Sequence, residues 1–259
     1  MGFSADWLAL REPADHAARD GALMAEAAVL AGARPVVVDL GAGTGSTRRA
    51  FGAALPDGAV WRMVEGDATL LALCEGERHL MDLRDLAALP LEGATLVTAS
   101  ALLDLVSEAW VAGLVAALAA RRLPFLAALS YDGRMAWTPA DAGDAGVTAA
   151  FNQHQRGDKG FGPALGPEAV PQAAALFEAA GYRVGLADSP WRIGPDQAGL
   201  GAALLEGIAA AAAEAGVAAD EAARWLAARR AMLGQGEMVI GHLDLLAVPE
   251  GREARDADG

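Results

Sequence analysis

The chain has one cysteine, Cys74, in 259 residues, and only 5% of its residues are aromatic. A single cysteine leaves no partner for a disulfide within the chain. No apolar run reaches about 18 residues without a charged residue, glycine or proline, so the sequence predicts no membrane span. The first six residues lack the basic start and apolar centre of a secretory signal. We therefore expect a cytoplasmic protein with no membrane partner.

Basic residues are also few, since 20 Lys and Arg stand against 34 Asp and Glu and give a formal net charge of −14. An acidic chain repels the phosphate backbone of nucleic acids at long range, which disfavours a nucleic-acid partner and leaves small molecules open. No His, Asp and Glu cluster has the spacing of metal ligands, so no metal site is predicted. The sequence leaves the oligomeric state open.

Glycine, by contrast, is abundant, and three of the 31 glycines stand at alternate positions after a β-branched run. Residues 36–45 read VVVDLGAGTG. This order predicts a strand, a sharp turn and then a helix from Ser46, because glycine adopts positive φ and lets a ligand lie against bare backbone. Asp39 lies at the end of the strand, where we expect its carboxylate to point into a ligand cleft.

The segment resembles motif I of the class I S-adenosylmethionine-dependent methyltransferases, an acid-x-Gly-x-Gly-x-Gly pattern. A dinucleotide-binding motif, G-x-G-x-x-G, needs its third glycine where this chain has Ser46, and it usually has an apolar residue in place of Asp39. The resemblance implies S-adenosyl-L-methionine as the cofactor. The residues implied to hold it here are Asp39, Gly41, Ala42, Gly43 and Gly45.

Three later segments match positions that these methyltransferases use for the same cofactor. The resemblance implies that Glu65, after the second strand, accepts the ribose hydroxyls, with Asp67 as the competing acid. It places Asp82 and Leu83, near the end of the third strand, beside the adenine. The segment implied to line the methionine and methyl end consists of Ser100, Ala101 and Leu102.

Apolar runs alternate with helical periods along the chain, which predicts an α/β fold. We expect a Rossmann-like, doubly wound sheet of seven strands, mostly parallel, with an antiparallel last strand. One domain would span 1–249, with an N-terminal helical segment in 1–33 (a helix over 13–31), a helical insertion at 195–234 between strands six and seven, and a polar, disordered tail at 250–259. The strands are expected at 35–40, 60–64, 78–81, 95–99, 125–130, 181–184 and 237–248.

Residues 131–167 contain many glycines and prolines and little apolar periodicity, which predicts a long loop region on the substrate side. His154 lies in its most polar part and is the leading candidate for a general base. Tyr131 and Asp132 directly follow the fifth strand and are the other catalytic candidates. The side chains expected to bind the substrate are Asn152, Arg156 and Lys159.

The predicted function is therefore S-adenosylmethionine-dependent methyl transfer to a small-molecule acceptor by in-line displacement, with the acceptor atom left open. The segments 7–15, 130–134 and 151–162 are similar to those of a bacterial subgroup of uncharacterised methyltransferases. Two alternatives stay open from the sequence. One is an NAD(P)-dependent oxidoreductase, and the other is a non-catalytic regulatory protein that binds S-adenosylmethionine.

Overall fold

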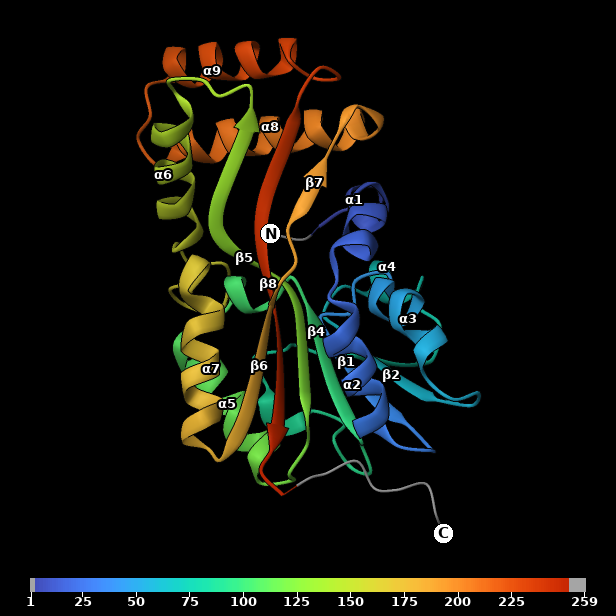
Figure 1. The fold of residues 1–259 in the computed structure, drawn as a ribbon. Helices are drawn as coiled ribbons and strands as arrows, with labels where there is room; N and C mark the ends of the chain where they lie inside the picture. The colour runs from blue at the N-terminus through green and yellow to red at the C-terminus, as the bar shows by residue number, and fades with distance from the viewer. Residues whose placement is uncertain (1–2, 252–259) are drawn as a thin grey trace.

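The computed structural model describes residues 3–251 and contains one mixed sheet, in the strand order β3-β2-β1-β4-β5-β8-β6 (Figure 1). Strands β1 to β5 are parallel, while β8 runs antiparallel to β5 and β6. This confirms the predicted fold class, with a short additional strand, β7, paired to β8. The strands are β1 (Val36–Leu40), β2 (Val60–Glu65), β3 (Glu77–Leu80), β4 (Leu96–Ser100), β5 (Phe125–Thr138), β6 (Tyr182–Asp188), β7 (Trp191–Ile193) and β8 (Glu237–Pro249).

Helices cover both faces of the sheet, α5 and α7 on one side and α2 and α3 on the other (Figure 1). Side-chain caps fix several of their starts: Ser4, Asp20 and Ser107 each accept from a backbone N–H three residues later. The helices are α1 (Ala5–Ala18), α2 (Gly21–Ala31), α3 (Ser46–Phe51), α4 (Ala68–Leu71), α5 (Glu108–Ala119), α6 (Asp144–Gln155), α7 (Ala169–Ala179), α8 (Ala198–Glu214) and α9 (Ala219–Ala231).

Strands β5 and β8 continue beyond the carboxyl edge of the parallel strands as a two-stranded ribbon, to which β7 adds a third strand (Figure 1). Helices α6, α8 and α9 pack on this ribbon around a separate apolar core that includes Trp137, Trp191 and Trp225. In the sequence, helices α8 and α9 come after β6 and before β8, within the range 195–234.

The structure differs from the long loop expected over 131–167. Residues 131–138 continue β5, and 144–155 form α6. The strand persists through Gly133 because the pairing register shifts there, between Tyr131 and Met135. Beyond the shift, exposed Arg134 and Ala136 alternate with half-buried Met135 and buried Trp137. Gly133, one of the glycines that suggested a loop, thus lies within a strand, at its irregularity.

The N-terminal segment also differs, since two helices replace the single helix expected over 13–31. Pro13 lies inside α1 rather than near a helix start, and Asp20 caps α2. Of the expected tail 250–259, residues 252–259 lie outside the described residues. Within residues 3–251, no helix is long and apolar enough to cross a membrane.

Candidate functional site

The glycine-rich turn lies at the carboxyl edge of the sheet, where the strand order reverses between β1 and β4. Ligands of doubly wound folds bind at this point. Gly41, Gly43 and Gly45 have φ of +66°, +55° and +84°, a region that other residues rarely adopt. The turn brings its amides toward β2, since Ala42 N donates to Val64 O at 3.0 Å. The sequence motif therefore forms the tight turn that was expected.

Glu65, the last residue of β2, lies against this turn. Its Oε2 accepts from Gly43 N at 2.8 Å, and its Oε1 accepts from Gly66 N and Asp67 N at 2.7 and 3.0 Å. The carboxylate of Asp67 instead caps α4, accepting from Thr69 N at 2.7 Å. Of the two competing acids, Glu65 is the one that faces the glycine turn.

Asp39 is only 1% exposed, and its two carboxyl oxygens have different surroundings. Thr98 Oγ1 donates to Asp39 Oδ1 at 2.7 Å, while Oδ2 has no hydrogen-bond partner among the described residues. Burial raises the pKa of this carboxyl to about 6, against the lowering effects of Thr98 and Arg19. A buried acid with one unpartnered oxygen fits a cationic or hydrogen-donating ligand.

An apolar wall faces the first glycine of the turn. A Cβ at Gly41 would lie 3.6 Å from Leu102 Cδ1 and 3.7 Å from Leu83 Cδ1, so both leucines approach its bare backbone. The Leu83 carbonyl is held by Trp110 Nε1 at 2.7 Å. Asp82 is exposed and pairs with Arg84, whose hydrogen bonds lower the pKa of Asp82 to about 2.

The end of β4 is joined to α1 by an arginine that the sequence analysis missed. Arg19 Nη2 donates to Ser100 Oγ at 2.9 Å, while the buried Nε of Arg19 has no partner within residues 3–251. Burial lowers the pKa of Arg19, and the negative charges of Asp15, Asp244 and Asp39 oppose this. The next residue, Ala101, has a φ of +49°, a strained conformation for a residue with a side chain.

Arg19 ends a row of buried charges along α1. Arg11, Asp15 and Arg19 are spaced four residues apart, and all three are buried, although helices normally bury an apolar stripe. Arg11 Nε donates to Asp15 Oδ2 at 2.8 Å, and Trp191 Nε1 donates to Asp15 Oδ1 at 3.0 Å. The four-residue spacing of alternating charges was readable in the sequence, but a helix expected to begin only at Pro13 concealed it.

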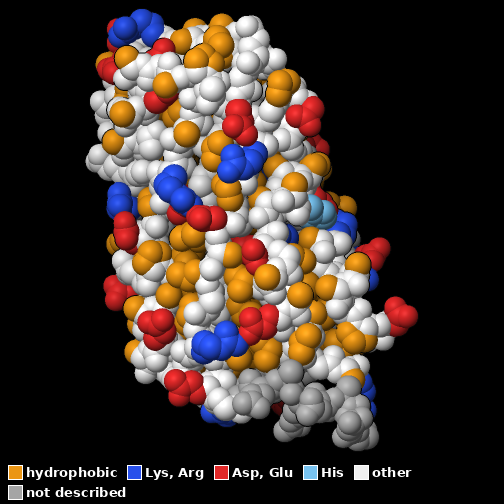
Figure 2. Space-filling view, in the orientation of Figure 1, with side chains coloured by type: hydrophobic (Ala, Val, Ile, Leu, Met, Phe, Trp, Pro, Cys, Tyr) orange, Lys and Arg blue, Asp and Glu red, His pale blue; other side chains and the backbone are white. Residues whose placement is uncertain are grey.

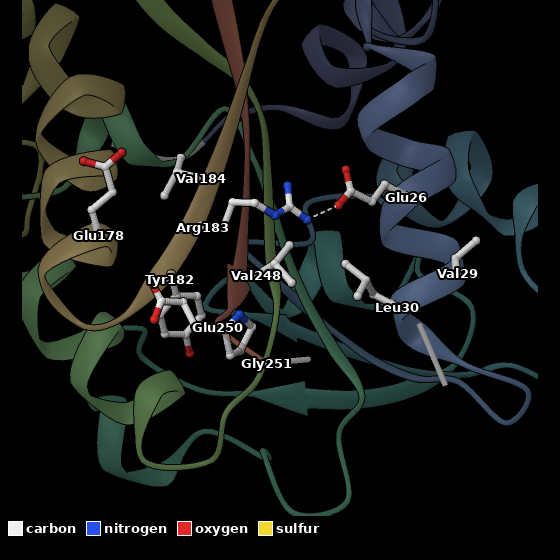
Figure 3. A pocket seen from close by; sticks show the side chains of 11 residues that line it. Glu26, Val29, Leu30, Glu178, Tyr182, Arg183, Val184, Val248, Glu250 and Gly251 are labelled. Atoms are coloured by element: carbon white, nitrogen blue, oxygen red, sulfur yellow. Dashed lines mark hydrogen bonds and ion pairs between the residues drawn. The ribbon is translucent and has the colours of Figure 1, made fainter. Parts of the chain in front are cut away.

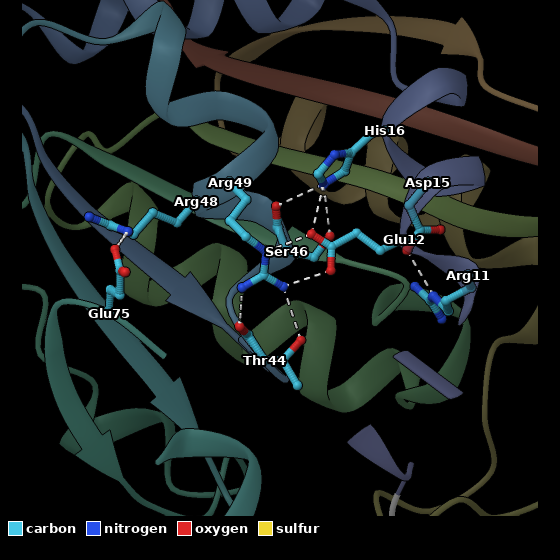
Figure 4. Close-up of polar contacts among 9 residues, drawn as sticks. All are labelled: Arg11, Glu12, Asp15, His16, Thr44, Ser46, Arg48, Arg49 and Glu75. Atoms are coloured by element: carbon cyan, nitrogen blue, oxygen red, sulfur yellow. Dashed lines mark hydrogen bonds and ion pairs between the residues drawn. The ribbon is translucent and has the colours of Figure 1, made fainter. Parts of the chain in front are cut away.

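A neighbouring face of α1 contacts the glycine turn and α3 (Figure 4). Glu12 accepts from Arg49 Nε at 2.6 Å and from Arg49 Nη2 at 2.7 Å, and His16 Nε2 lies 3.1 Å from Ser46 Oγ. A Cβ at Gly43 would lie 3.1 Å from Leu8 Cδ1, so α1 also packs directly on the middle glycine. Helix α1 therefore covers the turn and holds Arg19 beside it.

On the acceptor side, the structure brings Tyr131 and Asn152 together. Tyr131 Oη donates to Asn152 Oδ1 at 2.7 Å, and Asn152 Nδ2 donates to Gly133 O at 2.9 Å. Burial raises the pKa of Tyr131 well above its ordinary value. Asp132 forms an ion pair with Arg134, whose guanidinium also contacts Asp188.

His154 lies on a different face of α6. Its Nε2 is 3.0 Å from Glu214 Oε2 on α8, and its Nδ1 is 3.3 Å from Lys159 Nζ. Two positions along a helix correspond to about 200°, so Asn152 faces β5 while His154 faces α8. Arg156 is exposed and pairs with Glu168 at 3.7 Å. The structure thus brings Tyr131 together with Asn152 and His154 together with Lys159. Asp132 and Arg156 form ion pairs with other residues.

Two further buried groups were missed from the sequence. Asp104 lies in a short 3-10 helix after β4, and its Oδ1 has no partner among residues 3–251. Burial raises its pKa to about 6. His242 of β8 also has an unpartnered atom, Nδ1, and burial together with the nearby Arg11 lowers its pKa to about 3. Asp104 ends the segment after β4 that resembles the methyltransferases, and His242 stands in no motif, but only the fold shows that both side chains are buried.

A hollow of about 710 Å³ lies far from this edge, at the start of β6 (Figure 3). Because β6 runs parallel to β5, its first residue, Tyr182, marks the amino edge of the sheet. The Arg183–Glu26 ion pair crosses the hollow. Figure 2 shows hydrophobic side chains over the lower part of the molecule. Val29, which lines the hollow, is 59% exposed. The hollow and the glycine turn therefore lie at opposite edges of the sheet.

Cys74 is buried beside the turn, with Sγ 3.2 Å from Gly43 O, and burial raises its pKa to about 11. The thiol is therefore protonated near neutral pH and unreactive. Within residues 3–251, no group of three or more His, Cys, Asp and Glu side chains is placed to hold a metal ion.

No protein-family model matches the chain, and no curated protein matches it in sequence. Solved structures do match it in fold. A protein assigned as a type II methyltransferase from Anaeromyxobacter dehalogenans superposes with a TM-score of 0.54 at 16% identity, covering 90% of this chain and 98% of its own. A cyclopropane-fatty-acyl-phospholipid synthase-like protein from Lactobacillus casei gives 0.53 at 13%, covering 96% and 95%.

A third similar structure is a protein assigned as a methyltransferase from an antibiotic biosynthesis pathway of Anabaena variabilis. Its TM-score is 0.50 at 16% identity, and the match covers 90% of this chain and 99% of the other. At such low identities the likeness concerns the fold alone. The chain has the Rossmann-like fold of class I methyltransferases.

Proposed function

We propose that the chain is an S-adenosylmethionine-dependent methyltransferase that acts on a small molecule. The observation that carries this proposal is the pair of unpartnered buried atoms, Asp39 Oδ2 and Arg19 Nε, at the carboxyl edge of β1 and β4. The methionine end of the cofactor has one ammonium and one carboxylate. The Asp39 carboxylate is opposite in charge to the ammonium, and the Arg19 guanidinium is opposite in charge to the carboxylate, so the two free atoms complement this end of the cofactor.

The other residues around the turn suit the rest of the cofactor. Glu65 already accepts three backbone N–H bonds, but a carboxylate has about four acceptor sites, so it can also accept from a ribose hydroxyl. Leu83 would offer apolar surface to the adenine, and Asp82 lies at the same strand end. Ser100, Ala101 and Leu102 would line the methyl end.

S-adenosylmethionine supplies a methyl group that its sulfonium already makes electrophilic. The protein's task is therefore to orient the acceptor and to exclude water. Helix α1 covers the glycine turn through Leu8, Glu12 and His16, which suits the second task. No metal takes part in this proposal.

Calorimetry with S-adenosylhomocysteine and with NADH tests the proposal. We expect S-adenosylhomocysteine to bind and NADH not to bind, because Asp39 repels a phosphate and Ser46 stands where a dinucleotide motif has glycine. Binding of NADH alone would favour an oxidoreductase. Binding of S-adenosylhomocysteine without methyl transfer to any member of a panel of phenols, amines and carboxylic acids would favour a non-catalytic binding protein.

A further inference from the structure

Asp104 follows closely after the segment proposed to line the methyl end of the cofactor. It lies two residues beyond Leu102, in the 3-10 helix Leu103–Leu105 that connects β4 to α5. Its side chain is buried, the residue being 8% exposed, and Oδ1 has no hydrogen-bond partner among residues 3–251. A buried, unpartnered carboxyl oxygen is costly unless a ligand or water uses it. None of the residues proposed to hold the cofactor is a hydrogen-bond partner of this oxygen.

The groups that act electrostatically on Asp104 come from several elements. Arg11 of α1 and Lys159, in the segment after α6, are cations that favour its charged form, and the Tyr131 backbone N–H favours it as well. Arg11 is held in place by Asp15 at 2.8 Å and lies over the Trp191 ring, 5.5 Å from its centroid. Asp15 balances the charge of Arg11, and Asp104 balances that of Lys159, so a cationic amine would bring an unpaired charge into the cluster. The two cations also stabilise negative charge that develops on an oxygen.

The rings of Tyr131, Trp191 and His242 lie close to one another. The His242 ring centroid lies 4.7 Å from that of Trp191 and 6.3 Å from that of Tyr131. Tyr131 of β5 lies directly opposite His242 of β8, and the Tyr131 backbone N–H hydrogen-bonds the Asp104 carboxylate, so these groups belong to one cluster. Burial keeps the His242 ring neutral, and its unpartnered Nδ1 adds a hydrogen-bonding atom without charge. Flat rings and a neutral polar atom suit an aromatic ligand.

We propose that this cluster of Arg11, Asp104, Tyr131, Trp191 and His242 binds a phenol as the methyl acceptor, with Asp104 as the catalytic residue that takes its proton. This inference rests on the proposed methyltransferase function. The phenolic oxygen forms the new bond to the methyl carbon, and the carbon–sulfur bond of the sulfonium breaks with its electron pair going to sulfur. The phenolic proton passes to Asp104 Oδ1, so atoms and charge balance.

The acidity of the acceptor separates phenols from aliphatic alcohols. A phenol such as the tyrosine side chain has a pKa of about 10, whereas an alcohol lies nearer to bulk water at about 15.7. Burial raises the pKa of Asp104 to about 6. Proton transfer from a phenol is therefore uphill by roughly four pK units and from an alcohol by roughly ten, and only the first is within reach of a positioned carboxylate.

The test uses the full-length protein saturated with S-adenosylhomocysteine and two probes, 4-methylphenol and phenethylamine, titrated by calorimetry at pH 7.5. We expect 4-methylphenol to bind and phenethylamine to bind at least tenfold more weakly. Asp104→Asn should weaken 4-methylphenol binding by about tenfold, the effect of losing a hydrogen bond to a charged group. Asp57→Asn, an exposed acid in the turn before β2, should change nothing. Neither change should alter S-adenosylhomocysteine affinity.

Unaltered protein gives a second measurement that does not depend on a variant folding. Protonation of Asp104 between pH 7.5 and 5 should weaken 4-methylphenol binding. With S-adenosylmethionine, kept saturating at each pH, in place of S-adenosylhomocysteine, 4-methylanisole should form at a rate that falls over the same range. Equal binding of the two probes, or no effect of pH or of Asp104→Asn, would overturn the inference. Failure of S-adenosylhomocysteine itself to bind would overturn the proposed function instead.

Discussion

Arg19 Nη2 donates to Ser100 Oγ at 2.9 Å, across 81 residues of sequence. The bond ties the C-terminal end of α1 to the end of β4, and it leaves Arg19 Nε without a partner among residues 3–251. Burying an arginine with an unused hydrogen-bond donor costs free energy. We therefore expect a ligand carboxylate to accept from this donor.

Replacing Arg19 with methionine should weaken S-adenosylhomocysteine binding by roughly ten- to a hundredfold, because a hydrogen bond to a charged group is worth about 1.5–3 kcal/mol. Arg19→Lys keeps the charge but loses the planar guanidinium, and should recover part of the affinity. Calorimetry measures all three proteins. Arg48→Met is the matched control, since Arg48 pairs with Glu75 at the surface. Equal affinities for Arg19→Met and Arg48→Met would remove Arg19 from the site.

Substitutions of Glu65 and of Asp67 should have different effects on ligand binding and on stability. Glu65→Gln keeps the shape of the side chain but replaces an acceptor oxygen with an amide NH₂, and we expect about tenfold weaker S-adenosylhomocysteine binding. Asp67→Ala removes the cap of α4 and should lower the free energy of unfolding by about 1 kcal/mol, with binding unchanged. Thermal unfolding and calorimetry on both variants give the comparison. A reversed pattern would assign the ribose to Asp67.

Asp39 should make the ligand-free protein less stable as the pH rises. Its pKa is about 6 in the folded chain against an ordinary value of 3.8, so the folded state binds the proton more tightly. The contribution of Asp39 to the free energy of unfolding is fully present below about pH 4. It is lost as the pH rises through 6, by about 3 kcal/mol in total. Thermal unfolding at pH 5 and 7.5 should show a smaller difference for Asp39→Asn than for unaltered protein.

The same group links cofactor binding to pH. A ligand ammonium beside Asp39 favours the charged carboxylate, so S-adenosylhomocysteine should bind more tightly at pH 7 than at pH 5 and release protons as it binds. Calorimetry in buffers of different ionisation enthalpy measures this release. Asp57→Asn should behave like unaltered protein. Proton release that persists in Asp39→Asn would assign the linkage to another group.

The glycine turn and Glu65 could be predicted because their signals are local: a strand, a glycine-rich turn and an acid at the next strand end. The acceptor side could not be predicted in this way. Asp104 and His242 become neighbours of Arg11 only after β8 returns beside β5 and α1 folds over the edge. Buried and exposed residues alternate over 134–138, as in a strand, but Gly133 favoured a loop in the sequence.

His154 and Asp104 now stand as rival proton acceptors, and substitution should separate them. As a general base, the role predicted from the sequence, His154 would be required for turnover. The structure instead gives both of its ring nitrogens partners, Glu214 and Lys159, and places it between α6 and α8. We therefore expect His154→Ala to lower the free energy of unfolding by less than about 1 kcal/mol, since Glu214 is largely exposed, and to preserve methyl transfer.

Glu214→Gln is the matched control for this experiment, because it breaks the same contact from the other side. If the contact is structural, Glu214→Gln and His154→Ala should reduce the melting temperature similarly and leave the rate of 4-methylanisole formation within about twofold. A loss of turnover in His154→Ala alone, with S-adenosylhomocysteine affinity intact, would restore His154 as the base. It would also leave Asp104 without its catalytic role, since a single phenolic proton needs only one acceptor.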